Sequence, residues 1–440
     1  MGQGVRPLRS VPPLETTQLI QTHPRGAFVW YESYKPSTLP THEFWCWEEY
    51  NNFCEAKIIR ILITYANAGA GHRRAAEAIA QAAAAAYPTA DVQCHDLLAH
   101  VPGLLRRAYP WSYYLLVRYL SLFWGGCFAL LDTSAVYALV RPIRRAWNLL
   151  LAQGFIRWLR AQPPDLVVAT HFLPADVCGS GKQAGWLQAP LAVVITDLHP
   201  HRFWLAPEAD AVVVATPETA LTCERRGIPP NRVHVLGIPI AGAFHAPVDR
   251  ASLHQRLGLA PHRQTIVVTS GGTTVGPFEA VVRALMDVER TRPGRLQLLV
   301  VCGENTRAAE RLHRLAQACA MPVQVFGFVD NMPELMGASD LVVAKAGGLT
   351  VMEALGRGLP LVLYHAIPGQ EGFNAQYVVR HGAAVIARTP RDVVRVVERY
   401  FDDPQGATRM REAAVALSRP NAAEAIVSHV IGPLLAHAIT

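Results

Sequence analysis

The sequence predicts an α/β fold of two doubly wound domains in tandem, which face each other across a cleft. Short runs rich in Val, Ile and Leu recur along the chain, and longer stretches of helical character separate them. Such alternation is typical of parallel sheets that helices cover on both faces. The alternation pauses once, over residues 241–263, which contain several Pro and Gly. Because 440 residues also exceed what one hydrophobic core usually holds, we expect two domains.

The expected domain boundaries follow this alternation. Residues 1–56 show no period and scatter prolines, tryptophans and charges, so we expect a poorly ordered extension there. The first domain should span residues 57–240, residues 241–263 should connect the domains, and the second domain with its C-terminal helices should span residues 264–440. The expected strands lie, in chain order, within residues 61–66, 165–170, 191–197, 211–216, 265–272, 296–303, 323–328, 340–348 and 360–369.

The positive charge of the chain is concentrated in one segment. The formal net charge is +7, and residues 101–160 contain eight arginines and one acid among many aromatic and leucine side chains. This mixture suits an anionic membrane surface better than nucleic acid, whose binding proteins usually carry lysine-rich or glycine-arginine tracts. Arg118, Gly125 and Gly126 interrupt the apolar run, so we do not expect a single membrane-spanning helix. The alternative is an arginine-bearing amphipathic helix that packs on its own domain.

No pattern in the sequence indicates a metal or disulfide framework. The eight cysteines never occur as C-x-x-C, and with no apolar leader near the start they indicate a reducing cytoplasm. His199 and His201 form H-x-H without a third ligand, and no D-x-D motif occurs. A bound phosphate would therefore be neutralised by backbone amides and helix dipoles rather than by a divalent cation.

The stretch AKAGGLTVMEALGRGLP, residues 344–360, predicts an anion-binding turn in the second domain. Gly347 and Gly348 lie between a buried strand and a helix, where backbone N–H groups are unpaired and glycines let a phosphate approach. Thr350 and Glu353 form T-x-x-E, which a helix capping box would also explain. Capping alone does not explain the paired glycines before it.

Two further clusters in the second domain support a binding site. IPGQEGFNA, residues 367–375, places Gln370, Glu371 and Asn374 after a strand, where amides and carboxylates can recognise sugar hydroxyls. The alternative is a polar loop that caps a helix. SGGTTVG, residues 270–276, follows another strand and predicts a second phosphate-binding turn, although such glycines are also common for purely steric reasons.

The first domain carries a candidate catalytic histidine in NAGAGHRRAAEAI. Gly69 and Gly71 form a turn after the first strand, and His72 follows at or near the helix start, where a neutral imidazole can accept a proton. The alternative for His72 is a helix cap or a surface residue. Arg74 stands where the third glycine of G-x-G-x-x-G would be, so this is not a dinucleotide fingerprint. Asp197, in ITDLHPHRFW, could orient His72 or contact an acceptor.

Taken together, these motifs resemble glycosyltransferase family 28, and more narrowly its diacylglycerol glycosyltransferases, the monogalactosyldiacylglycerol synthases and the processive diacylglycerol glucosyltransferases. The resemblance covers roughly residues 57–430. The motifs that carry it are GAGH, TDLHPHRFW, GIPI, GPFEA, KAGGLTVMEALGRGLP and IPGQEGFNA.

This resemblance implies a GT-B fold and an inverting transfer of a hexose from UDP-glucose or UDP-galactose to the sn-3 hydroxyl of 1,2-diacylglycerol. The second domain would bind the UDP-sugar, and the first would bind the lipid and an anionic membrane. No cofactor or obligatory metal is expected, no nucleic acid partner is expected, and the location would be the cytoplasmic face of the cell membrane, held peripherally. The alternatives that stay open are an N-acetylglucosamine transferase acting on a polyprenyl-linked acceptor, a sugar-nucleotide epimerase, and a non-catalytic nucleotide-binding protein of the membrane surface.

The resemblance also implies roles for individual residues. His72 matches the general base of the family, with Asp197 as the second catalytic candidate. Glu353 would bind the ribose hydroxyls, the backbone near Phe328 would meet the uracil, and Gln370, Glu371 and Asn374 would hold the hexose. The residues of the two phosphate loops, all expected to bind the donor, are Gly271, Gly272, Thr273, Gly347, Gly348, Leu349 and Thr350. The residues expected to meet the acceptor or the membrane are Gly69, Gly71, Trp124, Arg141, Arg144 and Arg145.

Overall fold

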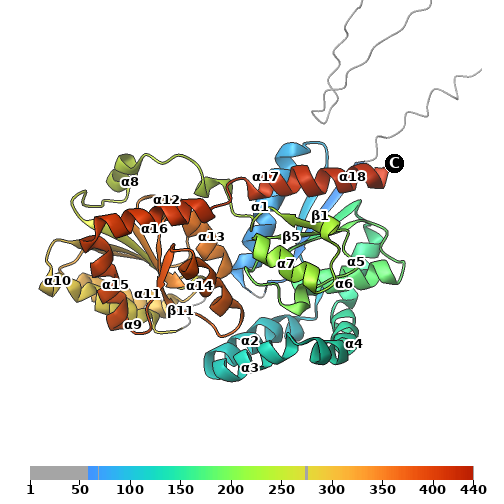
Figure 1. Ribbon diagram of the computed structural model, residues 1–440, viewed down its shortest axis with the longest axis horizontal. Helices are drawn as coiled ribbons and strands as arrows, with labels where there is room; N and C mark the ends of the chain where they lie inside the picture. Colours follow the sequence, from blue (N-terminus) through green and yellow to red (C-terminus); the bar gives the residue numbers. More distant parts are fainter. Residues whose placement is uncertain (1–57, 68, 273–275, 440) are drawn as a thin grey trace, which may run out of the picture. The chain divides into compact units, whose positions relative to one another are not determined.

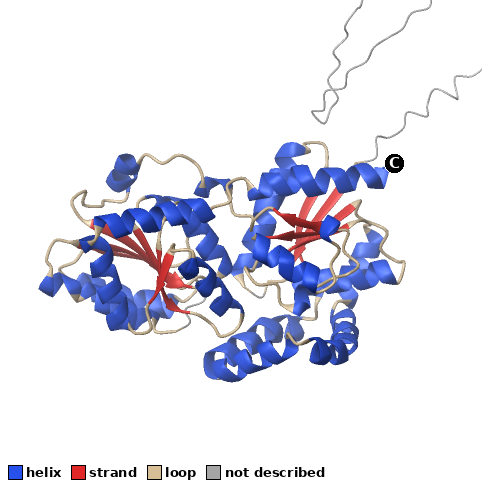
Figure 2. Cartoon of the chain, viewed as in Figure 1, coloured by secondary structure: helices blue, strands red, loops and turns tan. Residues whose placement is uncertain are grey.

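The computed structural model describes residues 58–67, 69–272 and 276–439, which contain two parallel sheets of six strands each. Helices flank both sheets (Figure 2), so the predicted α/β class with two doubly wound domains is confirmed. The expected extension, residues 1–56, lies outside the described residues. Below, the first lobe is residues 58–240 and the second lobe is residues 241–421.

The first sheet has the strand order β2-β1-β3-β4-β5-β6, and all neighbouring strands are parallel. Its strands are β1 (Arg60–Tyr65), β2 (Asp91–Asp96), β3 (Leu166–Ala169), β4 (Leu191–Val194), β5 (Ala211–Val214) and β6 (Val233–Val235). The strands β3, β4 and β5 are unbroken apolar runs because helices bury them on both faces. Each face of the sheet carries its own apolar core.

The helices of the first lobe are α1 (Ala70–Ala86), α2 (Gly103–Tyr119), α3 (Ser121–Leu131), α4 (Ser134–Leu151), α5 (Gln153–Ala161), α6 (Phe172–Gln183) and α7 (Pro217–Arg225). Short 3-10 turns span Leu97–His100, Arg202–Trp204 and Pro230–Arg232. The helices α2 to α5 form an insertion between β2 and β3 (Figure 1). Within the described residues no single helix has the length and apolarity to cross a bilayer, and only one bent pair, Phe123–Leu131 with Ser134–Leu151 at 93°, passes on length and composition.

The second sheet has the order β12-β11-β10-β7-β8-β9 and is also parallel throughout. Its strands are β7 (Gln264–Thr269), β8 (Leu296–Val301), β9 (Val323–Phe326), β10 (Leu341–Lys345), β11 (Leu361–His365) and β12 (Ala384–Ile386). Its helices are α8 (Arg250–Arg256), α9 (Phe278–Met286), α10 (Val288–Thr291), α11 (Thr306–Gln317), α12 (Met332–Gly337), α13 (Gly348–Gly356), α14 (Gln370–Arg380), α15 (Pro390–Asp402) and α16 (Pro404–Leu417).

Each sheet reverses its strand order once. In the first sheet the reversal lies between β1 and β3, and in the second it lies between β7 and β10. At such a point the connections leave toward opposite faces and open a crevice at the carboxyl ends of the two central strands. The loops after β1, β3, β7 and β10 are therefore the places where a ligand site is expected.

Residues 241–263, which the sequence predicts to connect the two domains, are folded onto the second lobe. They contain a 3-10 turn, Gly242–Phe244, and the helix α8. Phe244, Leu253 and Leu259 are buried in a core of the second lobe together with side chains of β10 and α13. Because burial of these apolar side chains stabilises their packing on the second sheet, the segment is part of the second lobe.

The C-terminal helices pack on the first lobe, so their predicted assignment to the second domain is wrong. The helix α17 (Ala422–Ile426), a π-helical turn (Val427–Ile431) and α18 (Gly432–Ile439) lie beside α1 (Figure 1). Ile426 and Ile431 are fully buried and share one core with Ile61 and Ile63 of β1. The chain therefore crosses back after α16, because these side chains complete the apolar cover of the first sheet.

The C-terminal helices should contribute measurably to the stability of the first lobe. Replacing Ile431 by Ala removes a fully buried side chain and should lower the free energy of unfolding by about 2–5 kcal/mol. Every tryptophan of the chain precedes residue 241, so the change in tryptophan fluorescence during urea unfolding does not come from tryptophans of the second lobe. Val415→Ala, at a side chain that is 62% exposed on α16, is the control and should leave the transition in place. An unchanged transition in Ile431→Ala would contradict this packing.

Candidate active site

His72 lies in the first turn of α1, directly after β1, and hydrogen bonds fix its imidazole. Its Nδ1 lies 3.0 Å from the carbonyl oxygen of Thr170 and 2.8 Å from Oγ1 of Thr196. The Thr170 hydroxyl in turn donates to the backbone carbonyl of His72, 2.9 Å away. Thr170 follows β3 and Thr196 follows β4, so three strand ends of the first sheet converge on this side chain. His72 is thus neither a helix cap nor a freely exposed surface residue.

These contacts determine the tautomer of the neutral imidazole. A carbonyl oxygen can only accept a hydrogen bond, so Nδ1 carries the proton that it donates to Thr170, and Nε2 keeps its lone pair. Burial lowers the pKa of His72 to about 4, although the Thr170 carbonyl favours the charged form. At neutral pH the side chain is therefore an uncharged base with Nε2 as its proton acceptor.

Asp197 does not orient His72, contrary to one of the two roles predicted for it. Its Oδ2 accepts a hydrogen bond from Nε1 of Trp204 (3.3 Å), and its Oδ1 accepts one from Nε2 of Gln370 (3.0 Å). Burial raises its pKa to about 6, although both hydrogen bonds favour the ionised form. The backbone carbonyl of Thr170 has the orienting role instead, because it lies at the neighbouring strand end.

The two glycine turns of the second lobe meet at its strand reversal. Gly271 follows β7 with φ of +73°, a conformation that side chains other than glycine rarely adopt. A Cβ on Gly271 would contact the side chain of Lys345 (3.4 Å), and one on Gly347 would lie 3.7 Å from its Nζ. Lys345 is the last residue of β10, so its ammonium group lies beside both turns. Thr273 lies outside the described residues.

The capping-box alternative for Thr350 and Glu353 is not what the structure shows. The helix α13 begins at Gly348, its N-cap residue is Gly347, and no side chain caps its first turn. Thr350 and Glu353 lie inside the helix, where Thr350 is half-buried and Glu353 is buried. The N–H groups of the first turn are thus left for an anion, which the positive end of the helix dipole also favours.

Glu371 is held by Lys345 and is not an open sugar ligand in this arrangement. Its Oε1 accepts from Lys345 Nζ, and its Oε2 accepts from the backbone N–H of Ile367 (3.0 Å). Both side chains are largely buried, with exposed fractions of 15% for Lys345 and 7% for Glu371. A largely buried lysine next to both glycine turns is the feature that could not be predicted from the sequence motifs alone.

Gln370 and Asn374 join the two lobes. Gln370 donates to Asp197, while the Asn374 amide accepts from the backbone N–H of Leu198 (3.1 Å) and donates to the carbonyl of Ala346 (3.2 Å). A Cβ on Gly348 would lie 2.7 Å from the carbonyl oxygen of Thr196, so only glycine fits there. The predicted hexose-binding residues therefore lie close to the His72 side of the crevice.

A cavity of about 460 Å³ lies between α1 and α13. Phe328, Leu349 and Glu353 of the second lobe line it, and Arg74 of the first lobe reaches into it. Burial raises the pKa of Glu353 to about 7, with Arg74 opposing the shift. The cavity brings together the two residues predicted for ribose and uracil, and its size fits a small ligand.

The remaining predicted residues of the phosphate and acceptor turns lie along the same junction. Gly71 faces Leu349, with 3.7 Å between a Cβ built on Gly71 and the Leu349 Cβ. A Cβ built on Gly272 would likewise lie 3.3 Å from the Ala70 Cβ. Gly69 is the N-cap residue of α1, with open space where its side chain would be.

The three arginines predicted for a membrane surface form ion pairs within the first lobe, and that prediction is wrong for them. Arg144 and Arg145 pair with Asp176 (2.9 and 3.3 Å), and Arg145 and Arg141 pair with Glu208 (2.7 and 3.3 Å). Their side chains anchor α4 on α6. Trp124 is half-buried, its ring 6.0 Å from that of Phe128. The helix α4 therefore matches the alternative, an arginine-bearing amphipathic helix that packs on its own domain.

The opposite face of α4 is apolar and exposed. Leu139, Ile143, Trp147 and Leu150 recur every three or four residues and have exposed fractions between 56% and 74%. On α3 and just before it, Leu120, Phe123 and Leu130 are also more than half exposed. Below, the α4 face means Leu139, Ile143, Trp147 and Leu150. Contiguous exposed apolar side chains of this kind mark surfaces that meet a partner or a membrane.

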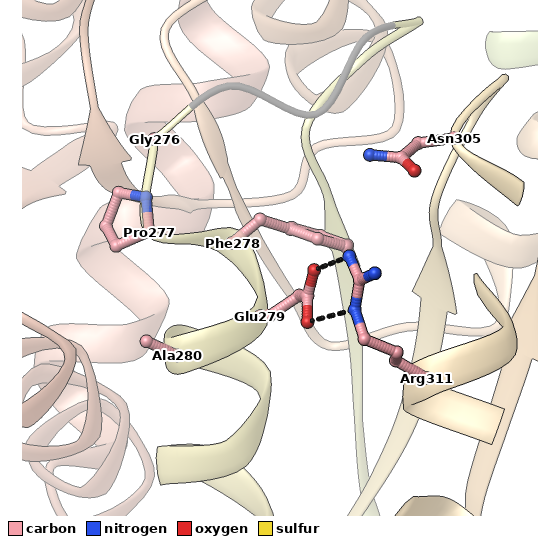
Figure 3. Close-up of a pocket in the computed structure, with 7 residues that line it drawn as sticks. All are labelled: Gly276, Pro277, Phe278, Glu279, Ala280, Asn305 and Arg311. Carbon is pink, nitrogen blue, oxygen red and sulfur yellow. Dashed lines mark hydrogen bonds and ion pairs between the residues drawn. The ribbon is translucent and has the colours of Figure 1, made fainter. Parts of the chain in front are cut away.

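The H-x-H pair and a second pocket carry no part of this site. His199 contacts Asp132 through Nε2 (3.2 Å), and His201 contacts the Phe128 carbonyl (3.0 Å). No cluster of three or more His, Cys, Asp or Glu suited to a metal occurs among the described residues. The second pocket, of about 190 Å³, lies at the start of α9 and includes the Arg311–Glu279 ion pair (Figure 3). None of the predicted site residues lines it.

Four residues of the site were not found from the sequence. Lys345 comes directly before the AGG turn. A lysine next to paired glycines could have indicated a group that binds phosphate. Thr170 and Thr196 end two strands next to β1, so the rule that parallel strand ends converge could have found them. Arg74 gave no signal, because nothing in the sequence places it against the second lobe.

Comparison with known proteins agrees with this site. The family model for monogalactosyldiacylglycerol (MGDG) synthase matches residues 72–240, and that for the glycosyltransferase family 28 C-terminal domain matches residues 265–426. A probable chloroplastic monogalactosyldiacylglycerol synthase of Nicotiana tabacum is 32% identical over 378 residues, which are 84% of this chain and 69% of that protein. A processive diacylglycerol beta-glucosyltransferase of Bacillus cereus is 31% identical over 274 residues, 62% of this chain and 69% of that protein.

Solved structures agree on the fold at lower identity. MurG of Acinetobacter baumannii has a TM-score of 0.56 at 16% identity and covers 85% of this chain and 99% of its own. The UDP-bound MnaA of S. aureus has a TM-score of 0.57 at 13% identity and covers 86% of this chain and 97% of its own. These likenesses support the expected two-domain GT-B fold. The chain belongs to glycosyltransferase family 28, in the group that includes the monogalactosyldiacylglycerol synthases and the processive diacylglycerol glucosyltransferases.

Proposed function

We propose that this protein transfers glucose or galactose from a UDP-sugar to the sn-3 hydroxyl of 1,2-diacylglycerol, with inversion at the anomeric carbon. The relatives that are 31% and 32% identical over the aligned residues are named as diacylglycerol glycosyltransferases, which favours this acceptor over a polyprenyl lipid. The observation that carries the proposal is the imidazole of His72, which Thr170 and Thr196 fix with its Nε2 lone pair available, while the carbonyl of the same Thr196 lies against Gly348 of the second lobe.

In the proposed reaction, His72 activates the acceptor. Its Nε2 removes the proton of the lipid hydroxyl while the oxygen forms a bond to the anomeric carbon of the sugar. The bond between that carbon and the diphosphate oxygen breaks, and the electron pair leaves with UDP. Displacement from the side opposite the leaving group inverts the anomeric configuration. The depressed pKa of His72 keeps the base uncharged over the neutral range.

On the donor side, Lys345 and the first turn of α13 would stabilise the negative charge that grows on the departing diphosphate. Preorganised N–H groups and a buried cation act strongly in a site that excludes water. Because the ammonium group of Lys345, which pairs with Glu371, and the uncapped first turn of α13 both lie beside the glycine turns, we propose that the transfer needs no divalent cation. In the same reading, Glu353 accepts hydrogen bonds from the ribose hydroxyls, and Phe328 lies at the uracil.

The α4 face would contact the membrane, in place of Arg141, Arg144 and Arg145. Four large apolar side chains along one helix can enter the interface of a bilayer, where the diacylglycerol lies. Arg157 and Arg160 on the following helix are exposed and can meet anionic headgroups. We propose peripheral attachment to the cytoplasmic face of the cell membrane, and the six described cysteines, all free thiols, suit that reducing compartment.

The activity is tested with the purified full chain and vesicles that contain diacylglycerol and an anionic lipid. Each radiolabelled UDP-hexose is added in turn, with and without EDTA, and the lipids are separated by thin-layer chromatography. We expect label in glycosyldiacylglycerol, equally with EDTA. Interconversion of UDP-sugars without lipid would indicate an epimerase, and UDP binding without any turnover would indicate a non-catalytic protein.

His72→Ala should abolish most of the turnover in this assay. Loss of the base should lower kcat by about 10²-fold or more, while the affinity for UDP stays nearly unchanged, because His72 lies on the acceptor side. Isothermal titration with UDP separates the two effects. A variant with normal turnover would remove His72 from the role of base.

Glu353 should make nucleoside binding depend on pH near neutrality. The pKa of Glu353 is raised to about 7, so its carboxylate is ionised above that pH and accepts both ribose hydroxyls, and protonation below it removes an acceptor. The affinity for uridine, which has no group titrating near pH 7, should therefore rise as the pH increases from 6 to 8. Glu353→Gln should bind uridine with an affinity that is flat over this range. The same pH dependence in both proteins would contradict the assignment.

The α4 face should be required for membrane binding but not for chemistry. The double variant Ile143→Asp with Trp147→Asp should reduce sedimentation with diacylglycerol vesicles by about tenfold or more, because each lost apolar side chain weakens insertion. Turnover of a short-chain diacylglycerol in solution should remain. Leu221→Asp, at a half-exposed leucine on α7, is the matched control. Equal sedimentation of the double variant and the control would place the membrane surface elsewhere.

A further inference from the structure

Arg74 of the first lobe reaches into the cavity of the second lobe and contacts three groups there. Its guanidinium carbon lies 5.5 Å from the centre of the Phe328 ring, and its Nη2 donates to the Val329 carbonyl (3.2 Å). Its Nη1 lies 3.9 Å from Oε1 of Glu353. The side chain is 26% exposed, so it is largely enclosed by these contacts.

These three groups coincide with the proposed nucleoside subsite. Glu353 is the carboxylate assigned to the ribose hydroxyls, and Phe328 marks the place of the uracil. A guanidinium is planar, carries hydrogen-bond donors at its edge and stacks on aromatic rings, as a nucleobase also does. Among the described residues, Arg74 is the one cationic side chain that forms an ion pair with the Glu353 carboxylate. The guanidinium therefore satisfies the same groups that a nucleoside would need.

We propose that Arg74 is a placeholder in the nucleoside subsite: it occupies the surface of Phe328 and the Glu353 carboxylate in the nucleotide-free protein, and the nucleoside of the donor displaces it. This inference rests on the proposed function, because it takes the cavity to be the nucleoside site. Arg74 is thus a residue that sets donor affinity by competing with the donor.

Displacement of Arg74 also couples donor binding to the junction between the lobes. Arg74 belongs to α1, the helix that carries His72, whereas Phe328, Val329 and Glu353 belong to the second lobe. When the guanidinium leaves, the lobes lose one cation–π contact, one hydrogen bond and one ion pair. Arrival of the nucleoside therefore removes contacts between the second lobe and the helix that carries His72.

The neighbouring Arg73 provides a matched comparison. It lies on the same turn of α1 and also lines the cavity, but its ion pair is with Glu77 of its own helix, 3.6 Å away, and not with Glu353. Removing Arg73 changes the net charge by the same amount as removing Arg74. A difference between the two variants therefore reports the contacts of Arg74 and not the charge alone.

The test is the affinity of the full chain for uridine, measured by titration calorimetry on wild type, Arg74→Ala, Arg74→Lys and Arg73→Ala. Uridine lacks phosphate, so it reports the nucleoside subsite without any attraction between a cation and the diphosphate. Arg74→Ala should bind uridine about threefold to tenfold more tightly, since competing contacts are lost. Arg74→Lys, which cannot stack as a planar fork, should show a smaller gain, and Arg73→Ala should change the affinity much less than Arg74→Ala.

Two results separate the inference from the function on which it rests. Unchanged or weaker uridine binding by Arg74→Ala, in a protein that keeps the wild-type melting temperature, would overturn the placeholder and show that Arg74 supports the ligand or ignores it. Failure of the wild type to bind either uridine or UDP would instead overturn the nucleotide site itself. Tighter binding by Arg74→Ala alone supports the placeholder.

Discussion

The reversal of strand order in each parallel sheet is the constraint on which this site depends. It brings the end of β1, with His72, to the end of β3, and it brings the glycine turn after β7 to the turn after β10. Neither pair is close in sequence, and both arise because parallel strands end at one edge of a sheet. The two edges then meet at Gly348, where a side chain would collide with the Thr196 carbonyl at 2.7 Å. Glycine at this position is thus a requirement of the junction as well as of anion binding.

The electrostatics of the two sides are opposite, as the chemistry requires. Burial and a backbone carbonyl keep His72 neutral with its proton on Nδ1, so the first lobe offers a lone pair. In the second lobe, Lys345 pairs with Glu371 beside the first turn of α13, which no side chain caps, so that side offers hydrogen-bond donors and the positive end of a helix dipole. An imidazole accepts a proton only when it is uncharged, and a departing diphosphate is stabilised by fixed positive groups and hydrogen-bond donors. Placing them in separate lobes keeps the cation from depressing the base further and lets both act on one sugar.

Much of the fold and part of the site could be predicted from the sequence. Parallel alternation, the glycine turns and His72 follow from local patterns, which is why they were predictable. Three features did not follow, and each depends on contacts between distant segments. The arginines of α4 find Asp176 and Glu208, which no local pattern links to them. The C-terminal helices return to the first sheet because its apolar face would otherwise be exposed. The partners of His72 are strand-end threonines, where the sequence suggested Asp197.

The proposed mechanism requires the diphosphate of the donor to lie at the first turn of α13 and beside Lys345, within reach of the His72 imidazole. A crystal structure of the full chain with UDP tests it most directly. We expect the β-phosphate to accept hydrogen bonds from the N–H groups after Gly347, with the ribose at Glu353 and the His72 Nε2 facing the open side of that phosphate. UDP bound away from the residues 347–353, or an imidazole turned so that Nε2 meets Thr170, would contradict it.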